Sequence, residues 1–232
     1  MEAEAEVGRR QGGRGVVRCG RPPRELAGKV EERILDAAGK VFLDRGFSGA
    51  SVDEIAEVAC AGKPTIYARF PSKEALFTAV IERLVRRNTR YEGISCIGAS
   101  IVDRLEALAA VILGRVLVPE TIGLIRVAIA EARRFPDLAT SVSRMGRERQ
   151  TDAVSRVFAE LAVSERTRSL PAFAADRLPE TARRFLDLVV LPMLVRALFG
   201  EDLPALHAEI GPHAVRSVAF FLAACSYRGD AF

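Results

Sequence analysis

The segment SVDEIAEVACAGKPTIYARFPSK (residues 51–73) contains two short helical patterns separated by a tight turn. It opens with Ser51-Val52-Asp53-Glu54, a capping-box sequence whose Ser and Glu side chains satisfy free backbone donors at a helix start. The buried stripe of this first helix would consist of Val52, Ile55, Ala56 and Ala59. Gly62 interrupts the pattern and Pro64 restarts it, because proline is tolerated in the first turn of a helix. The segment predicts a helix-turn-helix at about residues 50–70, whose second helix runs from about Lys63 to Arg69.

Longer helices are predicted on both sides of this segment. Before it, apolar residues recur at three- and four-residue spacing over residues 30–42, and Gly46 is expected to end that helix. After it, residues 71–72 break and recap the chain, and the apolar spacing of residues 76–84 defines a fourth helix that ends near Tyr91. The four helices together predict a small DNA-binding domain over residues 27–91.

The second short helix has the chemistry of a helix that enters a DNA major groove. Lys63 stands at its N-terminus, where the helix dipole disfavours a cation, so a phosphate would supply the missing partner. Thr65 and Tyr67 offer hydroxyl groups beside it. Ile66 and Phe70, four residues apart, point the opposite way and are expected to anchor the helix in the domain core.

Residues on either side of this helix extend the predicted contact surface. Ser51, whose helix presents free N–H groups, and Lys73 can hold phosphates on the two sides of the groove. Arg69 could reach a guanine edge or a phosphate. The whole predicted DNA-contacting set is Ser51, Lys63, Pro64, Thr65, Tyr67, Arg69 and Lys73. Basic residues continue along the sequence up to Arg90. The arginines at the end of this stretch are expected to form a solvated helix face and not a DNA contact.

Composition describes a globular chain without a membrane segment or a metal site. Apolar residues make up 49% and charged residues 28%, and the net charge of +4 permits an anionic partner without requiring one. The N-terminus lacks the apolar region of a signal peptide, and the longest apolar run, residues 188–195, is too short to span a bilayer, so we expect a cytoplasmic protein. The four cysteines form no CxxC pair, and His207 and His213 lie beside Gly211 and Pro212 in an expected loop or helix start. We predict neither a metal nor a cofactor.

The remainder of the chain also reads as helical, which predicts an all-α protein. Residues 1–26 are expected to form a flexible basic arm, and residues 92–232 a larger C-terminal domain. Its helices are predicted at about residues 101–118, 119–135, 137–163, 179–199 and 211–227. The last two carry apolar residues on most faces, which a monomer of this size could not easily cover, so a four-helix interface between two copies is expected.

Four stretches of the N-terminal half resemble the DNA-binding domain of TetR-type regulators. They are RILDAA (33–38), GF (46–47), SVDEIA (51–56) and KPTIYARFPSKEALF (63–77). The resemblance implies a homodimer bound to double-stranded operator DNA, with contacts from the residues at the positions of Lys63, Thr65, Tyr67 and Lys73. The sequence departs from the family pattern at three places. Cys60 and Ala61 stand where Gly and Val are usual, and Gly62 stands where a Ser or Thr cap is common. Ala68-Arg69 replaces a pair that is usually His or Tyr. These departures leave the operator sequence open.

The C-terminal half resembles the AcrR- or AefR-like branch more loosely, through IRV (125–127) and EARRFPDL (131–138). This resemblance implies an all-α ligand-binding and dimerisation domain, with an inducer pocket enclosed by helices within residues 105–158 and a small hydrophobic or amphipathic inducer. No single ligand contact is predicted. Arg126, Glu131 and Gln150 are polar groups near apolar faces that could orient an inducer, although pairing within a helix or at the surface is the commoner fate of such groups.

Three function classes are compatible with these features to different degrees. A transcriptional repressor released from its operator by a small molecule agrees with both halves of the chain. A dimeric activator or adaptor that needs no inducer shares the DNA-binding features, and the sequence does not separate the two. An enzyme would require a nucleophile with its base, a metal cluster or a phosphate-binding loop, and no such pattern is readable in the sequence.

Overall fold

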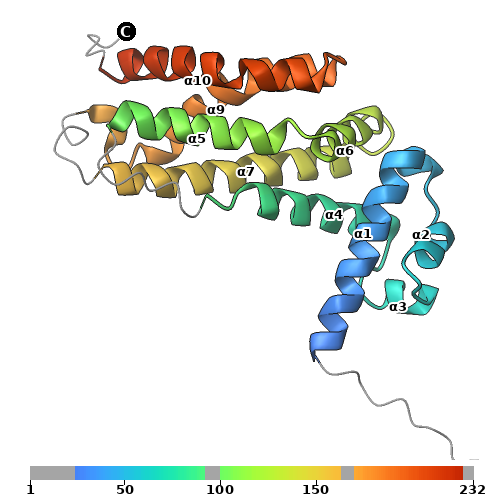
Figure 1. Cartoon of the computed structure of the whole chain (residues 1–232). Coiled ribbons are helices and arrows are strands. Elements are labelled where there is room, and N and C mark those ends of the chain that lie inside the picture. Colours follow the sequence, from blue (N-terminus) through green and yellow to red (C-terminus); the bar gives the residue numbers. More distant parts are fainter. Residues whose placement is uncertain (1–23, 92–99, 163–169, 227–232) are drawn as a thin grey trace, which may run out of the picture.

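A computed structural model of the chain describes residues 24–91, 100–162 and 170–226, and its regular elements within these ranges are all helical (Figure 1). The predicted all-α fold is therefore confirmed. The predicted arm, residues 1–26, lies outside the described residues apart from its last three, with which α1 begins. No single helix of the described ranges is both long and apolar enough to cross a membrane, and one bent pair of helices, residues 101–116 with 119–130, meets that requirement by length and composition alone.

Four helices form the N-terminal domain: α1 (Arg24–Gly49), α2 (Val52–Val58), α3 (Lys63–Tyr67) and α4 (Lys73–Asn88). Gly46, the predicted end of the first helix, breaks α1 with φ 71° and ψ 173°, a conformation that glycine adopts without strain. The break lets Phe47 fold back onto Phe42 and Phe77, with ring centroids 5.0–5.8 Å apart. This aromatic cluster is the centre of the domain core, against which α3 and the first turns of α4 are seated.

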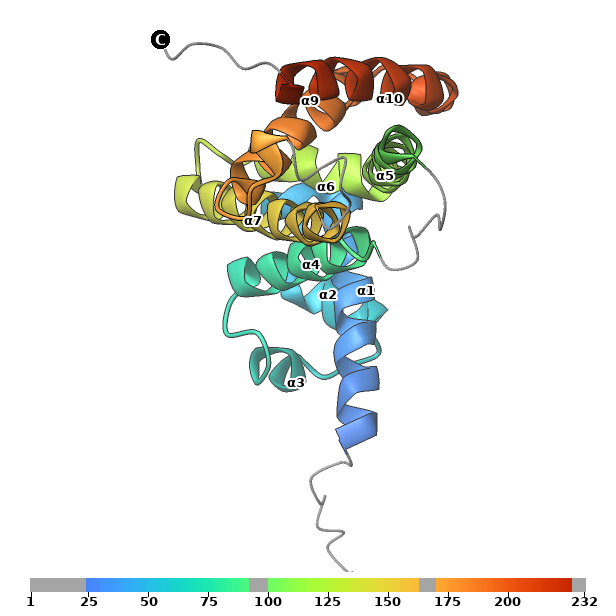
Figure 2. The ribbon, with the colours of Figure 1, turned by 90° about the vertical axis from the view of Figure 1, so that its left-hand side faces the viewer.

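The larger C-terminal domain contains α5 (Ile101–Val116), α6 (Pro119–Ala130), α7 (Pro136–Leu161), the short 3-10 helix η1 (Pro171–Phe173), α9 (Leu178–Leu198) and α10 (Leu203–Ser226). Figures 1 and 2 show these helices stacked in layers, with α10 on the outer side and α7 next to α4. Four phenylalanines meet in its core, at positions 158, 173, 185 and 221. Helix α4 leaves the small domain and packs along α7, so it belongs to both domains.

Two predicted helix boundaries are wrong, both at prolines. The last helix begins at Leu203 instead of residue 211, because the Asp202 carboxylate accepts the Ala205 N–H at 3.1 Å and starts it earlier, and Pro212 lies inside α10 with its ring exposed. His213 is therefore in a helix and not in a loop or at a helix start, and its Nε2 lies 2.8 Å from the Val189 carbonyl oxygen. Pro136 opens α7, as prolines commonly do in a first turn, whereas the predicted helices end at residue 135 and resume at residue 137.

Candidate nucleic-acid interface and ligand cavity

Helices α2 and α3 lie at the end of the molecule that is farthest from α10 (Figure 1). Helix α3 turns Ile66 inward with 1% of its surface exposed, and Phe70 just beyond it is buried as well. Tyr67 is 43% exposed on the opposite side. The expected division of this segment into an anchoring face and a free face is therefore confirmed, and the free face is available to a partner.

The start of α2 is capped by Ser51 as the sequence predicts. The Ser51 hydroxyl oxygen accepts the Glu54 N–H at 3.1 Å. The reciprocal half of the predicted capping box is not formed, because the Glu54 carboxylate accepts a hydrogen bond from Arg45 Nε at 3.1 Å and so ties α2 to α1. Ser51 remains exposed at the edge of the surface that α3 presents.

Lys63 has a partner that the sequence argument did not anticipate. Its ammonium group lies 2.8 Å from one carboxylate oxygen of Asp53, on α2, and 3.0 Å from the other. The hydrogen bond to Asp53, and then the charge of that carboxylate, raise the pKa of Lys63 above its usual value. The expectation that only a phosphate could complete this site is wrong, since Asp53 already occupies it. Both groups are exposed, so a phosphate can displace the carboxylate at low cost.

Lys73 and Arg69 are partly committed to contacts within the chain. Lys73 Nζ donates to the Ala50 carbonyl at 3.0 Å and lies 4.7 Å from the centre of the Phe47 ring. These contacts fasten the first residue of α4 to the junction between α1 and α2. Arg69 Nη1 donates to the Thr65 carbonyl at 3.1 Å and so lies back along α3.

The turn between α2 and α3 carries a strained residue at a position where the resemblance expects glycine. Cys60 has φ 47°, in the left-handed region, and its side chain is exposed. A residue with a Cβ atom loses roughly 1–2 kcal/mol in that conformation. Gly62, which follows, caps α3 without any side-chain hydrogen bond. The turn is thus held by its surroundings, including a hydrogen bond of 3.4 Å from Arg33 to the Cys60 carbonyl.

Two arginines farther along α4 form ion pairs, Arg83 within the N-terminal domain and Arg87 with the C-terminal domain. Arg83 pairs with Glu32 at 2.9 Å and with Asp36 at 2.8 Å, both on α1. Arg87 pairs with Glu120, the second residue of α6. The basic residues between Lys63 and Arg90 therefore fall into two groups. Those at the start of this stretch lie near the free side of α2 and α3, and Arg83 and Arg87 have partners within the protein.

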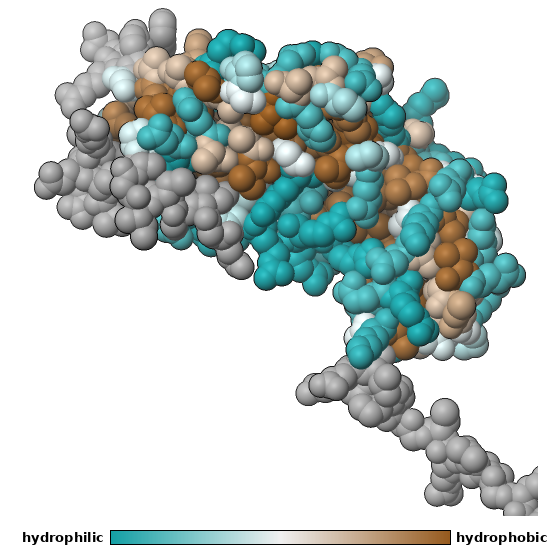
Figure 3. All heavy atoms as spheres, viewed as in Figure 1, coloured by the Kyte–Doolittle hydropathy of each residue, from teal (hydrophilic) through white to brown (hydrophobic). Residues whose placement is uncertain are grey.

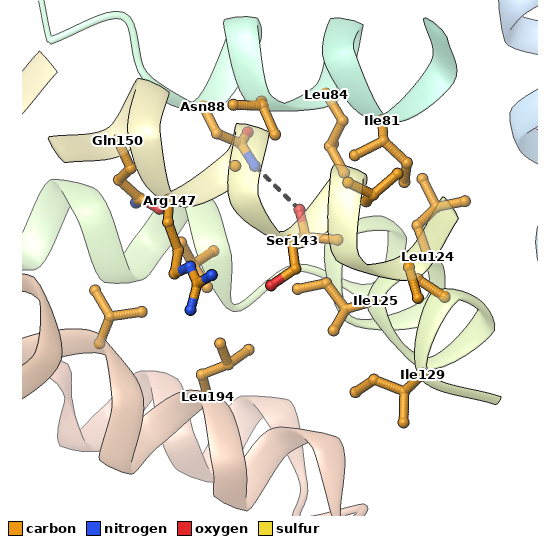
Figure 4. A pocket seen from close by; sticks show the side chains of 18 of the residues that line it. Ile81, Leu84, Asn88, Leu124, Ile125, Ile129, Ser143, Arg147, Gln150 and Leu194 are labelled. Carbon is orange, nitrogen blue, oxygen red and sulfur yellow. Dashed lines mark hydrogen bonds between the residues drawn. The ribbon is translucent and has the colours of Figure 1, made fainter. Parts of the chain in front are cut away.

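A cavity of about 580 Å³ lies between α4, α6, α7 and α9 (Figure 4). Its size is in the range of small-molecule sites. Most of the wall is aliphatic, and its polar side chains are Asn88, Thr89, Thr121, Thr140, Ser143, Arg147 and Gln150. Helix α4 supplies Ile81, Leu84, Val85 and Asn88 to this wall.

The polar groups suggested by the sequence for an inducer site have different positions. Gln150 lines the cavity and donates to the Tyr91 hydroxyl at 3.4 Å, and burial raises the pKa of that hydroxyl, which keeps it protonated. Arg126 instead donates to the carbonyl groups of Ala197 and Leu198 at the end of α9. Sequence reasoning missed Arg147, whose place four residues beyond Ser143 and three before Gln150 was the available signal, since this spacing gives one helix face.

The turn after α6 is fastened to the chain just before α2. The Glu131 carboxylate accepts the Ser48 N–H at 3.1 Å, and Arg134 Nη1 donates to the Ser48 hydroxyl oxygen at 3.1 Å. The rings of Phe47 and Phe135 meet edge to face with centroids 5.1 Å apart. We call these three contacts the Ser48 clamp. The clamp joins the cavity wall of α6 to the start of the helix-turn-helix.

The outer sides of α9 and α10 carry large apolar side chains that are open to solvent. Phe199 is 90% exposed and Phe220 is 68% exposed. The others on these two helices are Leu191, Val195 and Val215. Figure 3 shows apolar surface in the upper part of the molecule, where α10 and α5 lie, and a hydrophilic surface below it. An apolar area of this kind is typical of a protein interface.

Comparison with known families assigns both halves of the chain. Residues 34–80 match the family described as bacterial regulatory proteins, tetR family. Residues 103–227 match the AefR-like transcriptional repressor, C-terminal domain. The two matches cover the helix-turn-helix with its supporting helices and the domain that contains the cavity.

Individual relatives agree with these matches. The chain is 47% identical over 53 residues to the HTH-type transcriptional activator FasR of Mycolicibacterium smegmatis, which is 23% of this chain and 24% of the relative. It is 42% identical over 61 residues to the HTH-type transcriptional repressor ComR of Escherichia coli, 25% of this chain and 29% of the relative. The matched region thus spans only about a quarter of the length of these curated relatives.

Solved structures extend the likeness to most of the chain. A TetR-family transcriptional regulator from Mesorhizobium loti superposes with a TM-score of 0.70 and 26% identity, covering 85% of this chain and 97% of the other. The Flavonoid-responsive Regulator FrrA superposes with a TM-score of 0.67 and 30% identity, covering 87% of this chain and 100% of the other. Both halves therefore have the fold and the arrangement of these regulators.

Proposed function

Because this chain belongs to the TetR family, whose members are DNA-binding transcriptional regulators that act as dimers, we propose that it is a repressor released from its operator by a small molecule. The family assignment gives no support to the alternative that the protein is an enzyme. What this proposal adds for the chain itself is the sign of the regulation, the residues that contact DNA, the pairing surface and the site of the releasing ligand.

The observation that carries the proposal is the position of α4. Its first residue, Lys73, is fastened to the junction of α1 and α2, and its later turns supply Ile81, Leu84 and Asn88 to the cavity wall. A ligand that displaces these wall residues of α4 therefore also displaces the end of α4 that holds the helix-turn-helix in place. A ligand that favours the wrong arrangement by about 1–3 kcal/mol would lower DNA affinity roughly 5- to 150-fold.

The proposed DNA-contacting residues are Ser51, Lys63, Pro64, Thr65, Tyr67, Arg69 and Lys73. Lys63 would exchange Asp53 for a phosphate, and the exposed Tyr67 would contact the DNA beside it. Lys73 would contribute mainly by fixing α4, because its ammonium group is already engaged. Two copies paired through α9 and α10 would place two α3 helices in successive major grooves, roughly 34–36 Å apart.

The experiment that tests this function selects DNA fragments with the purified protein and measures binding to the selected sequence. Lys63→Ala and Tyr67→Ala are each expected to weaken operator binding about tenfold, and Lys63→Ala should also lower the salt slope of binding by about 1, because one phosphate contact is lost. Asp53→Asn should have the opposite effect and tighten binding by up to about fivefold, since it removes the competing carboxylate.

Arg86→Ala is the matched control for these variants. Arg86 is also a cation exposed on a helix, but it lies far along α4 from the helix-turn-helix. Its removal should change DNA affinity by less than about twofold. If Lys63→Ala and Arg86→Ala bound alike, or if no symmetric sequence emerged from the selection, the assigned DNA surface would be wrong.

The Ser48 clamp offers a separate test of the coupling between the domains. The double variant Glu131→Ala with Arg134→Ala removes two hydrogen bonds to Ser48, each worth about 1 kcal/mol. We expect the backbone amides of α2 to lose about tenfold in hydrogen-exchange protection, because the junction before α2 opens more often. Arg133→Ala, at the exposed neighbouring residue, should leave exchange unchanged. Equal protection in all three proteins would contradict a role of the clamp.

An activator is the second candidate, because the relative FasR, which is 47% identical over 53 residues, is named as an activator. A reporter gene controlled by the selected operator separates the two candidates. Expression should rise when the regulator is deleted if it is a repressor and fall if it is an activator.

A further inference from the structure

We propose that the cavity between α4, α6, α7 and α9 selects a monoanionic amphiphile, a carboxylic acid whose head group binds Arg147 and whose aliphatic body extends toward Ile129. This inference rests on the proposed function, in which the cavity holds the releasing ligand, and it adds the chemical class of that ligand. It is argued from the charge, the polarity and the shape of the wall.

The charge of the wall is the first argument. Arg147 is the one charged side chain among the described residues that line the cavity, and no Asp or Glu lines it. A cationic ligand would meet a like charge and no counter-charge. An anionic ligand would gain a charge-assisted hydrogen bond, and the planar guanidinium group matches the two oxygens of a carboxylate.

The second argument is that the guanidinium group of Arg147 has no partner among the described residues, whereas Asn88 and Gln150 are already engaged. Asn88 Nδ2 donates to the Thr121 hydroxyl oxygen at 3.2 Å, and Gln150 Nε2 donates to the Tyr91 hydroxyl at 3.4 Å. No acceptor among the described residues contacts the guanidinium group of Arg147. Figure 4 shows this side chain extending from α7 into the space beside Leu194 of α9. Arg147 is therefore the charged donor available to a ligand, beside the hydroxyl groups of Thr140 and Ser143 in the same wall.

The polar and apolar parts of the wall are separated in space. Arg147, Gln150 and Asn88 lie toward one end in Figure 4, and Leu124 and Ile129 lie toward the other. A ligand with a polar head and an apolar tail matches this arrangement in one orientation only. A ligand that is polar at both ends would place its second polar group against leucine and isoleucine side chains that offer it no hydrogen-bond partner.

The size and the make-up of the wall define the rest of the ligand. A volume of about 580 Å³ holds a small organic molecule, and within the described part of the chain no aromatic side chain lines the cavity to stack on a flat ring. An aliphatic body therefore fits as well as a ring. A single arginine matches the charge of a carboxylate, whereas a phosphate dianion would leave one negative charge without a counter-charge among the described residues of the wall.

The test uses three probes that share a ten-carbon chain: decanoate, decan-1-ol and decylamine. Their dissociation constants for the full-length protein are measured by competition with the fluorescent apolar anion 8-anilinonaphthalene-1-sulfonate, and their effect on operator binding is measured in parallel. We expect decanoate to bind about tenfold more tightly than decan-1-ol, and decylamine to bind most weakly. Bound decanoate should lower operator affinity.

Variants of two arginines on α7 identify the head-group site. Arg147→Gln should reduce decanoate binding about tenfold, to the level of decan-1-ol, and leave decan-1-ol within about twofold. Arg144→Gln is the matched control, because Arg144 lies one turn earlier, does not line the cavity and pairs only weakly with Glu148 at 4.0 Å. It should leave the preference for decanoate intact.

The outcomes separate this inference from the proposed function. Equal binding of the three probes, or a decanoate affinity that Arg147→Gln does not change, overturns the inference even if the probes still release DNA. Binding of decanoate that depends on Arg147 but leaves operator affinity unchanged supports the inference and overturns the inducer part of the proposed function. Absence of binding by all three probes overturns both.

Discussion

Phe220→Glu is expected to convert the protein from a dimer to a monomer and to weaken operator binding by at least about 100-fold. Phe220 is 68% exposed on α10, where it lines a hollow together with Leu188 of α9. In the proposed dimer its ring would be buried, and a carboxylate at that position would lose its hydration. A monomer also forfeits the gain from two linked binding sites, which is worth about 10²–10⁴ in affinity.

The measurement combines sedimentation velocity with a gel shift on the selected operator. Val102→Glu is a suitable control, because Val102 is also an exposed apolar residue but lies in the first turn of α5 instead of on α9 or α10. The control should remain dimeric and bind DNA normally. A Phe220→Glu protein that stays dimeric would show that the two copies pair through a different surface.

Phe77→Ala is expected to destabilise the N-terminal domain by about 3–5 kcal/mol. Phe77 is 1% exposed, and its ring lies 5.0 Å from that of Phe42 and 5.4 Å from that of Phe47. Phe47 in turn carries the ammonium group of Lys73 over its face. The loss of the central ring therefore removes packing from the core and support from the junction that seats the helix-turn-helix. DNA binding should weaken along with stability.

Urea unfolding followed by circular dichroism gives the size of this effect. Phe77→Leu keeps most of the buried volume and should cost less than about 1.5 kcal/mol. A loss of less than about 1 kcal/mol for Phe77→Ala would mean that the three-ring cluster does not hold the domain together. If Phe77→Ala does not fold, Phe42→Leu reports on the same cluster, because Phe42 is fully buried against Phe77.

The sequence predicted the helix-turn-helix well because its signals are local. The Ser51 cap, the Gly46 break and the anchoring of Ile66 each depend on a few neighbouring residues, and each is present in the structure. The pairing of Lys63 with Asp53 was missed for a different reason. The helix-dipole argument treats a helix start in isolation, whereas the partner comes from the preceding helix and depends on the angle of the turn.

The same limit explains the errors in the C-terminal half. Gly211-Pro212 is a strong local break signal, yet α10 continues through it because Leu206 and Val218 on either side are buried in one continuous core. The cavity could not be predicted from any one segment, since α4, α5, α6, α7 and α9 all contribute to its wall. Arg147 in particular stands in a polar stretch of α7 and resembles any solvated arginine until α9 is placed opposite it.

Part of the cavity wall is also part of the core of the DNA-binding domain. Ile81, Leu84, Leu124 and Val142 line the cavity and belong to the buried cluster that contains Phe42 and Phe77. Substitutions among these residues would change both the ligand cavity and the packing of the DNA-binding domain. Ile125, Ile129 and Leu194 line the cavity without belonging to that cluster. Substitutions that change the ligand are therefore least constrained at these three positions. A relative can change its ligand specificity there and still bind the same operator.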